Sequence, residues 1–161
     1  MNGQIPAPAQ GLYVPARRHG ELIFVSGMTP RRNGTLLHTG QVGLDAPAEI
    51  YCDAVEIATE NALQAAAAQL ISGEQISAVL ALTVYVNAPP GYTRHSQIAD
   101  LASRYLERNI VGGGLPSRAA IGVASLPGGA VTEISLVAVV RPPRGADHPA
   151  TAGFPESTPT V

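Results

Sequence analysis

Short apolar segments separated by glycine and proline breaks constrain this chain more than any other feature. Residues 22–25 (LIFV) lie between two glycines, and residues 78–86 form a longer aliphatic run that ends at Pro-Pro-Gly. Two further runs, at 118–124 and 130–140, flank a Leu-Pro-Gly-Gly turn. Runs of this length and composition are typical of buried strands, and we expect residues 78–86 to be buried on both faces.

Residues that favour turns and caps complete the predicted order of elements. The pair Asn33-Gly34 predicts a tight hairpin, after which a second strand is expected to return beside the first. Asp45 is positioned to cap an alanine-rich helix at 47–71, and a second helix is predicted at 92–108, before three consecutive glycines. The order β-β-α-β-α-β-β predicts an α+β domain, with one mixed sheet and two helices on one face.

The two ends of the chain differ from its middle. Residues 1–10 and 142–161 are rich in proline and lack apolar periodicity, so we expect a flexible N-terminal segment, a domain at 11–141 and a Pro-rich disordered tail. The single cysteine, Cys52, can form neither an internal disulfide nor a cysteine metal cage, which favours a reducing compartment. The first twenty residues contain no apolar run of the kind found in a signal peptide, and no stretch of the sequence approaches the length of a membrane span. A cytoplasmic protein without a membrane partner is therefore expected.

Composition predicts self-association. Only 14% of the residues are charged, while 45% are hydrophobic and the mean hydropathy is +0.14. A soluble monomer rarely exposes large apolar patches, so we expect identical copies to cover the face of the sheet that the helices leave bare. The net charge of -2 and the scattered positions of the 10 basic residues lack the footprint of a nucleic-acid-binding protein. No nucleic-acid partner is expected.

Two charged residues lie within predicted strands that are otherwise apolar. Glu133 interrupts the last strand, and Arg118 begins the strand before it. A carboxylate in such a strand must be paired, hydrated at an edge or facing a cavity. If the last two strands pair, both side chains can reach one crevice, where the arginine would bind a carboxylate through two hydrogen bonds and the glutamate would orient a water. The alternative interpretation is a structural ion pair between them.

An ordered set of motifs resembles a known family. The segments GELIFVSG (20–27), TVYV (83–86), Pro-Ser-Arg (116–118) and Leu-Pro (126–127), followed by Glu-Ile (133–134), occur in the order found in the RidA/YjgF/YER057c/UK114 family. The similarity covers about residues 10 to 141. The long first helix and the sequence around residues 39–43 are most similar to a larger branch of that family, whose members mostly have no assigned function.

The resemblance implies a chorismate-mutase-like fold, a homotrimer with clefts between subunits, and no cofactor. It also implies hydrolysis of reactive enamines or imines, such as 2-aminoacrylate, to 2-keto acids and ammonium. In this family Arg118 would hold the carboxylate of a small imine or keto acid, and Glu133 would position the attacking water. Tyr13 would direct its hydroxyl at substrate or water, and Ser26 and Gly27 would line the pocket.

Two positions depart from the deaminase-active branch of the family. Ser96 occupies the place of a usual asparagine, and Ala120 that of a frequent cysteine, although both remain candidates for the substrate-binding surface. Three alternatives therefore stay open. The chain could be a non-catalytic trimer that binds small keto or amino acids as a sensor, an enzyme acting on a larger imine or carbonyl acid, or a ribonuclease, which the acidic pI disfavours.

The remaining candidate residues predict no further chemistry. The four histidines are far apart in sequence and lack the spacing of metal ligands, so no metal site is expected; they are His19, His38, His95 and His148. Cys52 is expected to be a buried thiol rather than a nucleophile. The glycines at 112–114 lack the Lys-Ser/Thr of a phosphate loop and are interpreted as a mobile loop before Arg118.

Overall fold

The computed structural model describes residues 11–142. The predicted N-terminal segment 1–10, the tail from residue 143 onward and His148 lie outside the described residues. The family motifs and the seven candidate site residues all lie within them.

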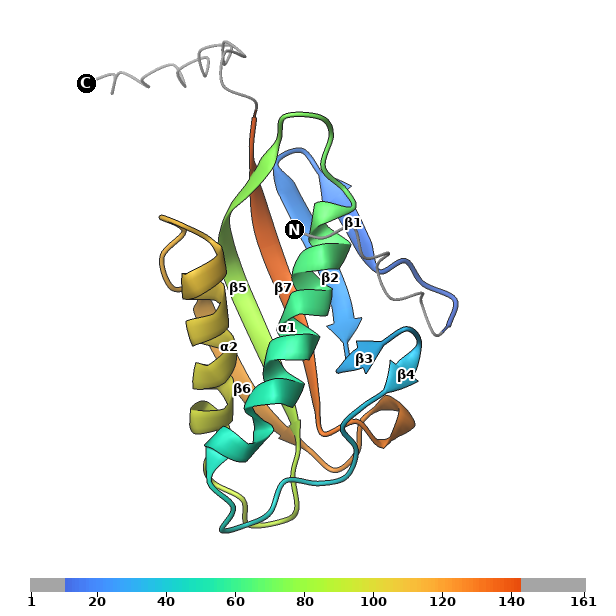
Figure 1. Cartoon of the computed structure of the whole chain (residues 1–161), viewed down its shortest axis with the longest axis vertical. Helices are drawn as coiled ribbons and strands as arrows, with labels where there is room; N and C mark the ends of the chain where they lie inside the picture. The colour runs from blue at the N-terminus through green and yellow to red at the C-terminus, as the bar shows by residue number, and fades with distance from the viewer. Residues whose placement is uncertain (1–10, 143–161) are drawn as a thin grey trace, which may run out of the picture.

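One mixed sheet carries two helices on a single face (Figure 1). The strands lie in the order β1-β2-β7-β5-β6, in which β5 and β6 are parallel and every other neighbouring pair is antiparallel. The five strands are β1 (Ala16–His19), β2 (Leu22–Met28), β5 (Gln75–Asn87), β6 (Ser117–Val123) and β7 (Thr132–Arg141). The helices α1 (Cys52–Ala67) and α2 (His95–Asn109) both pack on the sheet and on each other. The predicted α+β architecture is confirmed.

The predicted hairpin is present, but it lies outside this sheet. Strands β3 (Arg31–Arg32) and β4 (Thr35–Leu36) pair only with each other among the described residues. Asn33 and Gly34 have φ values of 51° and 79°, the left-handed conformation that a two-residue hairpin turn requires. The strand beside β2 is instead β1, which the sequence prediction missed because its residues, Ala-Arg-Arg-His, include no apolar run.

Both helices are shorter than predicted. A 3-10 turn at Ala48–Tyr51 precedes α1, and its N-cap is Pro47, with no side-chain hydrogen bond from Asp45 or any other residue. The predicted cap is therefore wrong. The buried face of α1 is rich in alanine, which lets the helix approach the sheet closely; Ala54, Ala58, Ala62 and Ala65 are at most 2% exposed. The second helix starts at His95 rather than at residue 92.

The central strand β5 is buried on one face only, which corrects the prediction for residues 78–86. Leu82, Val84 and Val86 are at most 1% exposed beneath the helices, whereas the residues that alternate with them are half-buried. The reason is that no element within residues 11–142 covers the opposite face, which we call the open face of the sheet. Phe24 on β2 and Ile121 on β6 are exposed by 48% and 41%.

An ion pair fixes the loop between α1 and β5 to β1. Arg18 donates two hydrogen bonds to Glu74, at 2.6 and 2.7 Å, and a third to the carbonyl of Gln69. Glu74 also accepts the backbone N–H of Ile71 at 2.9 Å. These contacts hold the pKa of Glu74 at about 2, below its usual range.

No helix within residues 11–142 is long and apolar enough to cross a membrane.

Candidate functional site

The strands that carry Arg118 and Glu133 are not neighbours. Strand β5 lies between β6 and β7, so the predicted pairing of the last two strands is wrong. Arg118 is opposite Leu82 of β5, whereas Glu133 is opposite Tyr85. An offset of three residues and two strand spacings separates their Cα atoms by roughly 14 Å. Because three is odd, the two side chains point to opposite faces of the sheet.

Glu133 lies on the open face, beside a β-bulge in β2. The register between β2 and β7 shifts between Val25 and Met28, which places one extra residue in β2. Gly27 lies in this bulge, and a Cβ there would overlap the Glu133 carboxylate. Gly27 and Glu133, which were predicted as separate site residues, are thus in direct contact, and the absence of a side chain at residue 27 is what allows the carboxylate to lie there.

The Glu133 carboxylate is half-buried and makes no hydrogen bond or ion pair with any residue between 11 and 142. Burial raises its pKa above the usual value. A partly dehydrated carboxylate without a partner favours the neutral form and is poised to hydrogen-bond water or a ligand. Glu133 is therefore not part of a structural ion pair with Arg118 within one chain.

Ser26 and Tyr13 are connected to the bulge by sequence and by hydrogen bonds. The backbone N–H of Ser26, next to Gly27 in the bulge, bonds the carbonyl of Pro15, and its hydroxyl donates to the carbonyl of Val14 at 2.8 Å. Tyr13 immediately precedes Val14 and is 47% exposed. The turn before β1 thus brings Tyr13 to the bulge. We refer to Tyr13, Ser26, Gly27 and Glu133 as the glutamate group.

Tyr85 is a neighbour of this group that the sequence prediction missed. It lies directly opposite Glu133 in the ladder between β5 and β7. Residues opposite each other on one face have Cβ atoms about 5 Å apart. Ile121, opposite Tyr85 on β6, continues the same row and is exposed. Strict alternation along residues 82–86 would have placed Tyr85 on the same face as Glu133, had β5 been recognised as the central strand.

Arg118 lies on the helix side of the edge strand β6, where α2 holds it. Its Nη1 donates to Asp100 Oδ1 at 2.7 Å and to Ser103 Oγ at 2.9 Å. Its side chain remains 22% exposed. The other edge of the guanidinium, formed by Nε and Nη2, makes no hydrogen bond with a residue between 11 and 142. This free edge has the geometry that binds a carboxylate through two parallel hydrogen bonds.

Two other predicted residues lie on the same side of the molecule as Arg118. Ala120 is opposite Val84 and packs against the core beneath α2. Ser96 is exposed in the first turn of α2, one turn before Asp100. Gly122 is the next residue of β6 on this side of the sheet, and a Cβ there would overlap the ring of His95. Arg118, Ala120 and Ser96 form what we call the arginine group, which a single sheet separates from the glutamate group.

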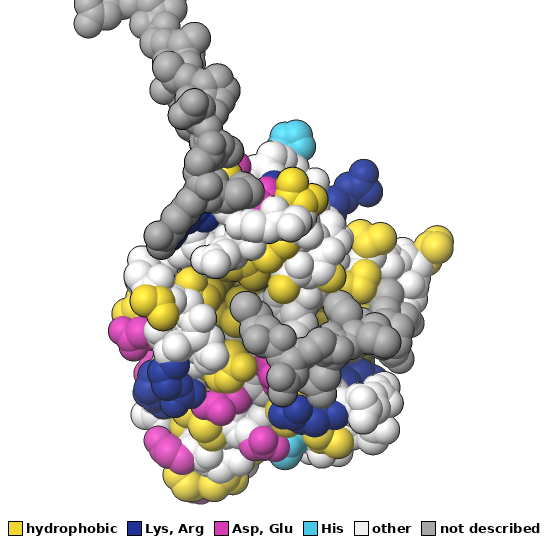
Figure 2. Space-filling view, turned by 45° about the horizontal axis from the view of Figure 1, so that its top comes forward, with side chains coloured by type: hydrophobic (Ala, Val, Ile, Leu, Met, Phe, Trp, Pro, Cys, Tyr) yellow, Lys and Arg dark blue, Asp and Glu magenta, His cyan; other side chains and the backbone are white. Residues whose placement is uncertain are grey.

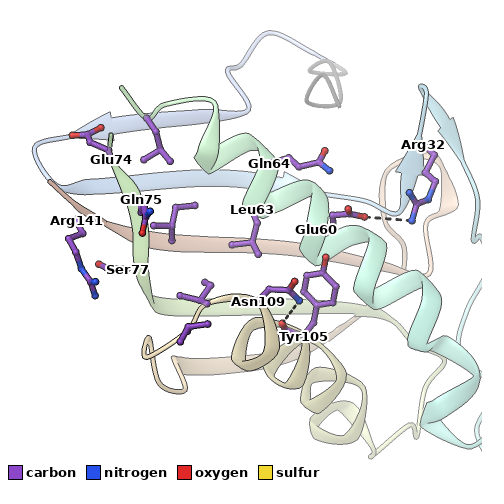
Figure 3. Close-up of a pocket in the computed structure, with 14 residues that line it drawn as sticks. Arg32, Glu60, Leu63, Gln64, Glu74, Gln75, Ser77, Tyr105, Asn109 and Arg141 are labelled. Carbon is purple, nitrogen blue, oxygen red and sulfur yellow. Dashed lines mark hydrogen bonds and ion pairs between the residues drawn. The ribbon is translucent and has the colours of Figure 1, made fainter. Parts of the chain in front are cut away.

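A groove in the structure contains neither group. It has a volume of about 1020 Å³ and lies between the C-terminal halves of α1 and α2 (Figure 3). Its lining includes Leu63, Ile76 and Tyr105 as well as Arg32, which pairs with Glu60 at 3.6 Å. Burial, followed by the charges of Glu60 and Glu56, raises the pKa of Tyr105. None of the seven predicted site residues lines this groove.

On the face that Figure 2 shows, the basic side chains of residues 11–142 are separated from one another. Arginine and acidic side chains are interspersed with apolar ones on the face in Figure 2. The guanidinium groups of six arginines contact an acidic side chain or a backbone carbonyl; these are Arg18, Arg31, Arg32, Arg94, Arg108 and Arg118. Residues 11–142 also bring no three His, Cys, Asp or Glu side chains together in a way that could hold a metal ion.

The surroundings of Cys52 and of the glycine loop at 112–114 indicate structural roles for both. Burial and the nearby Glu56 raise the pKa of Cys52, which favours the unreactive thiol. In the loop before β6, Gly112 and Gly114 have φ values of 77° and 66°. Gly113 lies against the backbone of Ser77 and Ala78, where a Cβ would come within 3.0 Å of the Ser77 carbonyl oxygen. This part of the loop is therefore packed on β5.

Comparisons with known proteins agree with this fold. The sequence profile of the family described as Endoribonuclease L-PSP matches residues 4–140. A Trypanosoma cruzi protein named TCP17 is 32% identical over 136 residues, which cover 81% of this chain and 82% of the relative.

Two solved structures are similar over most of their length. A protein of unknown function from Agrobacterium tumefaciens is 31% identical, with a TM-score of 0.72, and the match covers 84% of this chain and 86% of that one. A candidate endoribonuclease from Shewanella oneidensis is 27% identical, with a TM-score of 0.74 and coverage of 84% and 90%. Sequence profile, relatives and fold lead to one conclusion: this chain belongs to the endoribonuclease L-PSP family, which is also known as the RidA/YjgF family.

Proposed function

We propose that this protein hydrolyses reactive enamines and imines of small carboxylic acids to 2-keto acids and ammonium, at sites that two copies of the chain build together. The observation that carries the proposal is the separation of two complementary groups. The arginine group offers a free guanidinium edge for a carboxylate, and the glutamate group offers an unpaired carboxylate for a water. A three-carbon substrate cannot contact both across roughly 14 Å of one sheet.

A second copy of the chain resolves this separation. The open face carries the glutamate group together with exposed apolar side chains, and the arginine group lies at the free edge strand β6. If the edge of one copy meets the open face of the next, the Arg118 of one subunit comes to the Glu133 of the other. A ring of three copies would contain three such sites, and cyclic closure would leave no open face unmatched.

The reaction requires the protein to orient the substrate and to accept a proton from water. An enamine first takes a proton on carbon and loses one from nitrogen to become the imine, and water then adds to the C=N carbon as its oxygen loses a proton and the nitrogen gains one. The resulting carbinolamine expels ammonia and leaves the 2-keto acid. Arg118 would fix the carboxylate, so that the electrophilic carbon faces the water held by Glu133, which accepts a proton from that water.

The direct test generates imines from several amino acids with an amino-acid oxidase and follows their decay with and without the protein. We expect faster decay with the wild-type protein. Arg118→Ala is expected to reduce the added rate by about 100-fold or more, because the carboxylate loses its bidentate partner. Arg104→Ala removes an exposed arginine on the side of α2 that faces α1 and is the matched control. Equal rates for the wild type and Arg118→Ala would contradict the proposal.

A second candidate is a sensor that binds keto or amino acids without turnover. It is favoured by Ser96 and Ala120, which replace usual site residues of the deaminase branch while Arg118 is kept. Calorimetry with 2-ketobutyrate distinguishes the two, because binding without imine hydrolysis would support the sensor.

The family description and the Shewanella relative also name endoribonucleases. An RNA ladder that stays intact with highly purified protein would exclude that activity.

A further inference from the structure

Helix α2 contacts the proposed substrate-binding arginine with two side chains of different charge. Asp100 Oδ1 and Ser103 Oγ lie 2.7 and 2.9 Å from Nη1 of Arg118. They are three residues apart on the helix, so they occupy the same face and approach the same nitrogen. Nη1 carries two hydrogens, and each of these contacts uses one. The nitrogen is therefore saturated by the protein itself.

This saturation leaves one way for a carboxylate to bind. A guanidinium has five N–H donors, and two are used by α2. The remaining fork that can hold both oxygens of a carboxylate is the edge formed by Nε and Nη2. A rotation of the guanidinium would exchange its two terminal nitrogens and break both contacts with α2. Asp100 and Ser103 thus hold this edge in one orientation.

Asp100 also changes the charge that a ligand meets. The carboxylate of Asp100 offsets the positive charge of Arg118, so the pair is close to neutral. A bound monoanion keeps two hydrogen bonds with Arg118 and meets modest repulsion from Asp100. A dianion of similar size meets about twice that repulsion and about twice the attraction of Arg118, because both Coulomb energies scale with its charge. Asp100 therefore reduces the advantage that a second negative charge would give a ligand.

We propose that Asp100 and Ser103 are positioning residues that fix the Nε/Nη2 edge of Arg118, and that Asp100 shifts the selectivity of this site from dianions toward monoanionic carboxylates. The selectivity for ligands rests on the proposed function, whereas the anchoring of Arg118 does not. Sequence reasoning singled out neither residue, because both lie on an amphipathic helix where polar residues are ordinary. Only their contacts with Arg118 distinguish them.

The first measurement requires no ligand. Rotation about the Cζ–Nε bond of arginine can be followed by NMR of the side-chain nitrogens, with Arg104, which is exposed, as the internal reference. We expect slow rotation of Arg118 in the wild type and in Asp100→Asn, because the amide oxygen still accepts the hydrogen bond. Fast rotation is expected in Asp100→Ala. Equal rates for Arg118 and Arg104 in the wild type would overturn the anchoring.

The second measurement compares pyruvate with oxalate, a monoanion and a dianion of nearly equal size, by calorimetry. Asp100→Asn should raise the affinity for oxalate relative to pyruvate by about three- to tenfold, because it removes one negative charge near the ligand at partial exposure. Ser103→Ala, which removes no charge, should leave this ratio unchanged. An unchanged ratio in Asp100→Asn would overturn the selectivity, while loss of both ligands in Arg118→Ala would show that the proposed site itself stands. A wild-type protein that binds neither anion would overturn the proposed function and the selectivity, with the anchoring decided separately by NMR.

Discussion

Glu133 connects the local geometry to the proposed chemistry. Its carboxylate is half-buried without a partner among residues 11–142, and burial raises its pKa. Only the ionised form can accept a proton from water. As the pH falls through this raised pKa, the active fraction falls, so the acidic limb of kcat/KM should lie above the usual glutamate value of about 4.5.

The corresponding variant is Glu133→Gln. It keeps the shape of the side chain but cannot accept a proton, so we expect imine hydrolysis to fall by about 100-fold and the acidic limb to disappear. Glu107→Gln, at an exposed position of α2, is the control. Steady-state rates between pH 4 and 9 provide the measurement, and a Glu133→Gln enzyme that keeps the wild-type profile would refute the assigned role.

Gly27 is expected to affect activity through its contact with Glu133 and not through the conformation of the bulge. A Cβ at residue 27 would overlap the carboxylate, so Gly27→Ala must displace the Glu133 side chain. We expect a large loss of activity with a cooperative unfolding transition retained. In the Glu133→Gln background the same substitution should cost little more, because the displaced group is already inactive. Additive losses in the double variant would argue against this coupling.

Among the elements, the loop between α1 and β5 depends on one ion pair. The pKa of Glu74 is about 2 in the folded chain, against about 4.5 in a free glutamate, chiefly because Arg18 bonds its carboxylate. A lowered folded-state pKa stabilises the fold at pH values above the unfolded value. That stabilisation is lost as the pH falls from about 4.5 toward about 2.

Glu74→Gln is therefore expected to lower the thermal midpoint at pH 7, with the difference from the wild type shrinking as the pH approaches 2. Thermal unfolding followed by circular dichroism across this range is the measurement. Glu107→Gln, which removes an exposed and unpaired carboxylate, should leave the midpoint nearly unchanged. A difference between the wild type and Glu74→Gln that is constant with pH would contradict the role of the ion pair.

The sequence predicted the elements whose apolar pattern is strong and missed those that depend on pairing. Residues 78–86 and both helices were found because their periodicity is local. Strand β1 was missed because its stability comes from hydrogen bonds to β2 and from Arg18, not from an apolar run. The order of strands in the sheet depends on contacts between distant segments, and for that reason β5 between β6 and β7 could not be foreseen.

The candidate site was predictable to a similar degree. Family resemblance named Arg118, Glu133 and Gly27 as separate residues, and only the structure shows that the last two are in contact. The position of Asp100 beside Arg118, and of Tyr85 beside Glu133, follows from strand order and helix packing. Neither position is encoded in a short motif. The groove between α1 and α2 likewise arises from the divergence of two helices and has no counterpart in the sequence pattern.

For the whole molecule, the exposed apolar side chains of the open face predict self-association. We expect a trimer of about 50 kDa, given 16.6 kDa for one chain. Phe24→Glu places a charge on the open face, where Phe24 is 48% exposed, and should yield folded monomers. Ile71→Glu, at a position that is 67% exposed in the loop after α1, should leave the trimer intact. Sedimentation of the three proteins provides the comparison, and a monomeric wild type would contradict the assembly.

The most direct test of the shared site combines two inactive variants. Arg118→Ala and Glu133→Gln chains carrying different affinity tags are co-expressed, and oligomers that contain both tags are purified. If each site takes Arg118 from one subunit and Glu133 from its neighbour, every cyclic trimer that contains both variants restores about a third of its sites, because only one of its three interfaces joins an intact Arg118 to an intact Glu133. We predict recovery of imine hydrolysis to about that fraction of the wild-type rate. Mixed oligomers that remain as inactive as the parent variants, when the wild type is active, would contradict a site built between subunits.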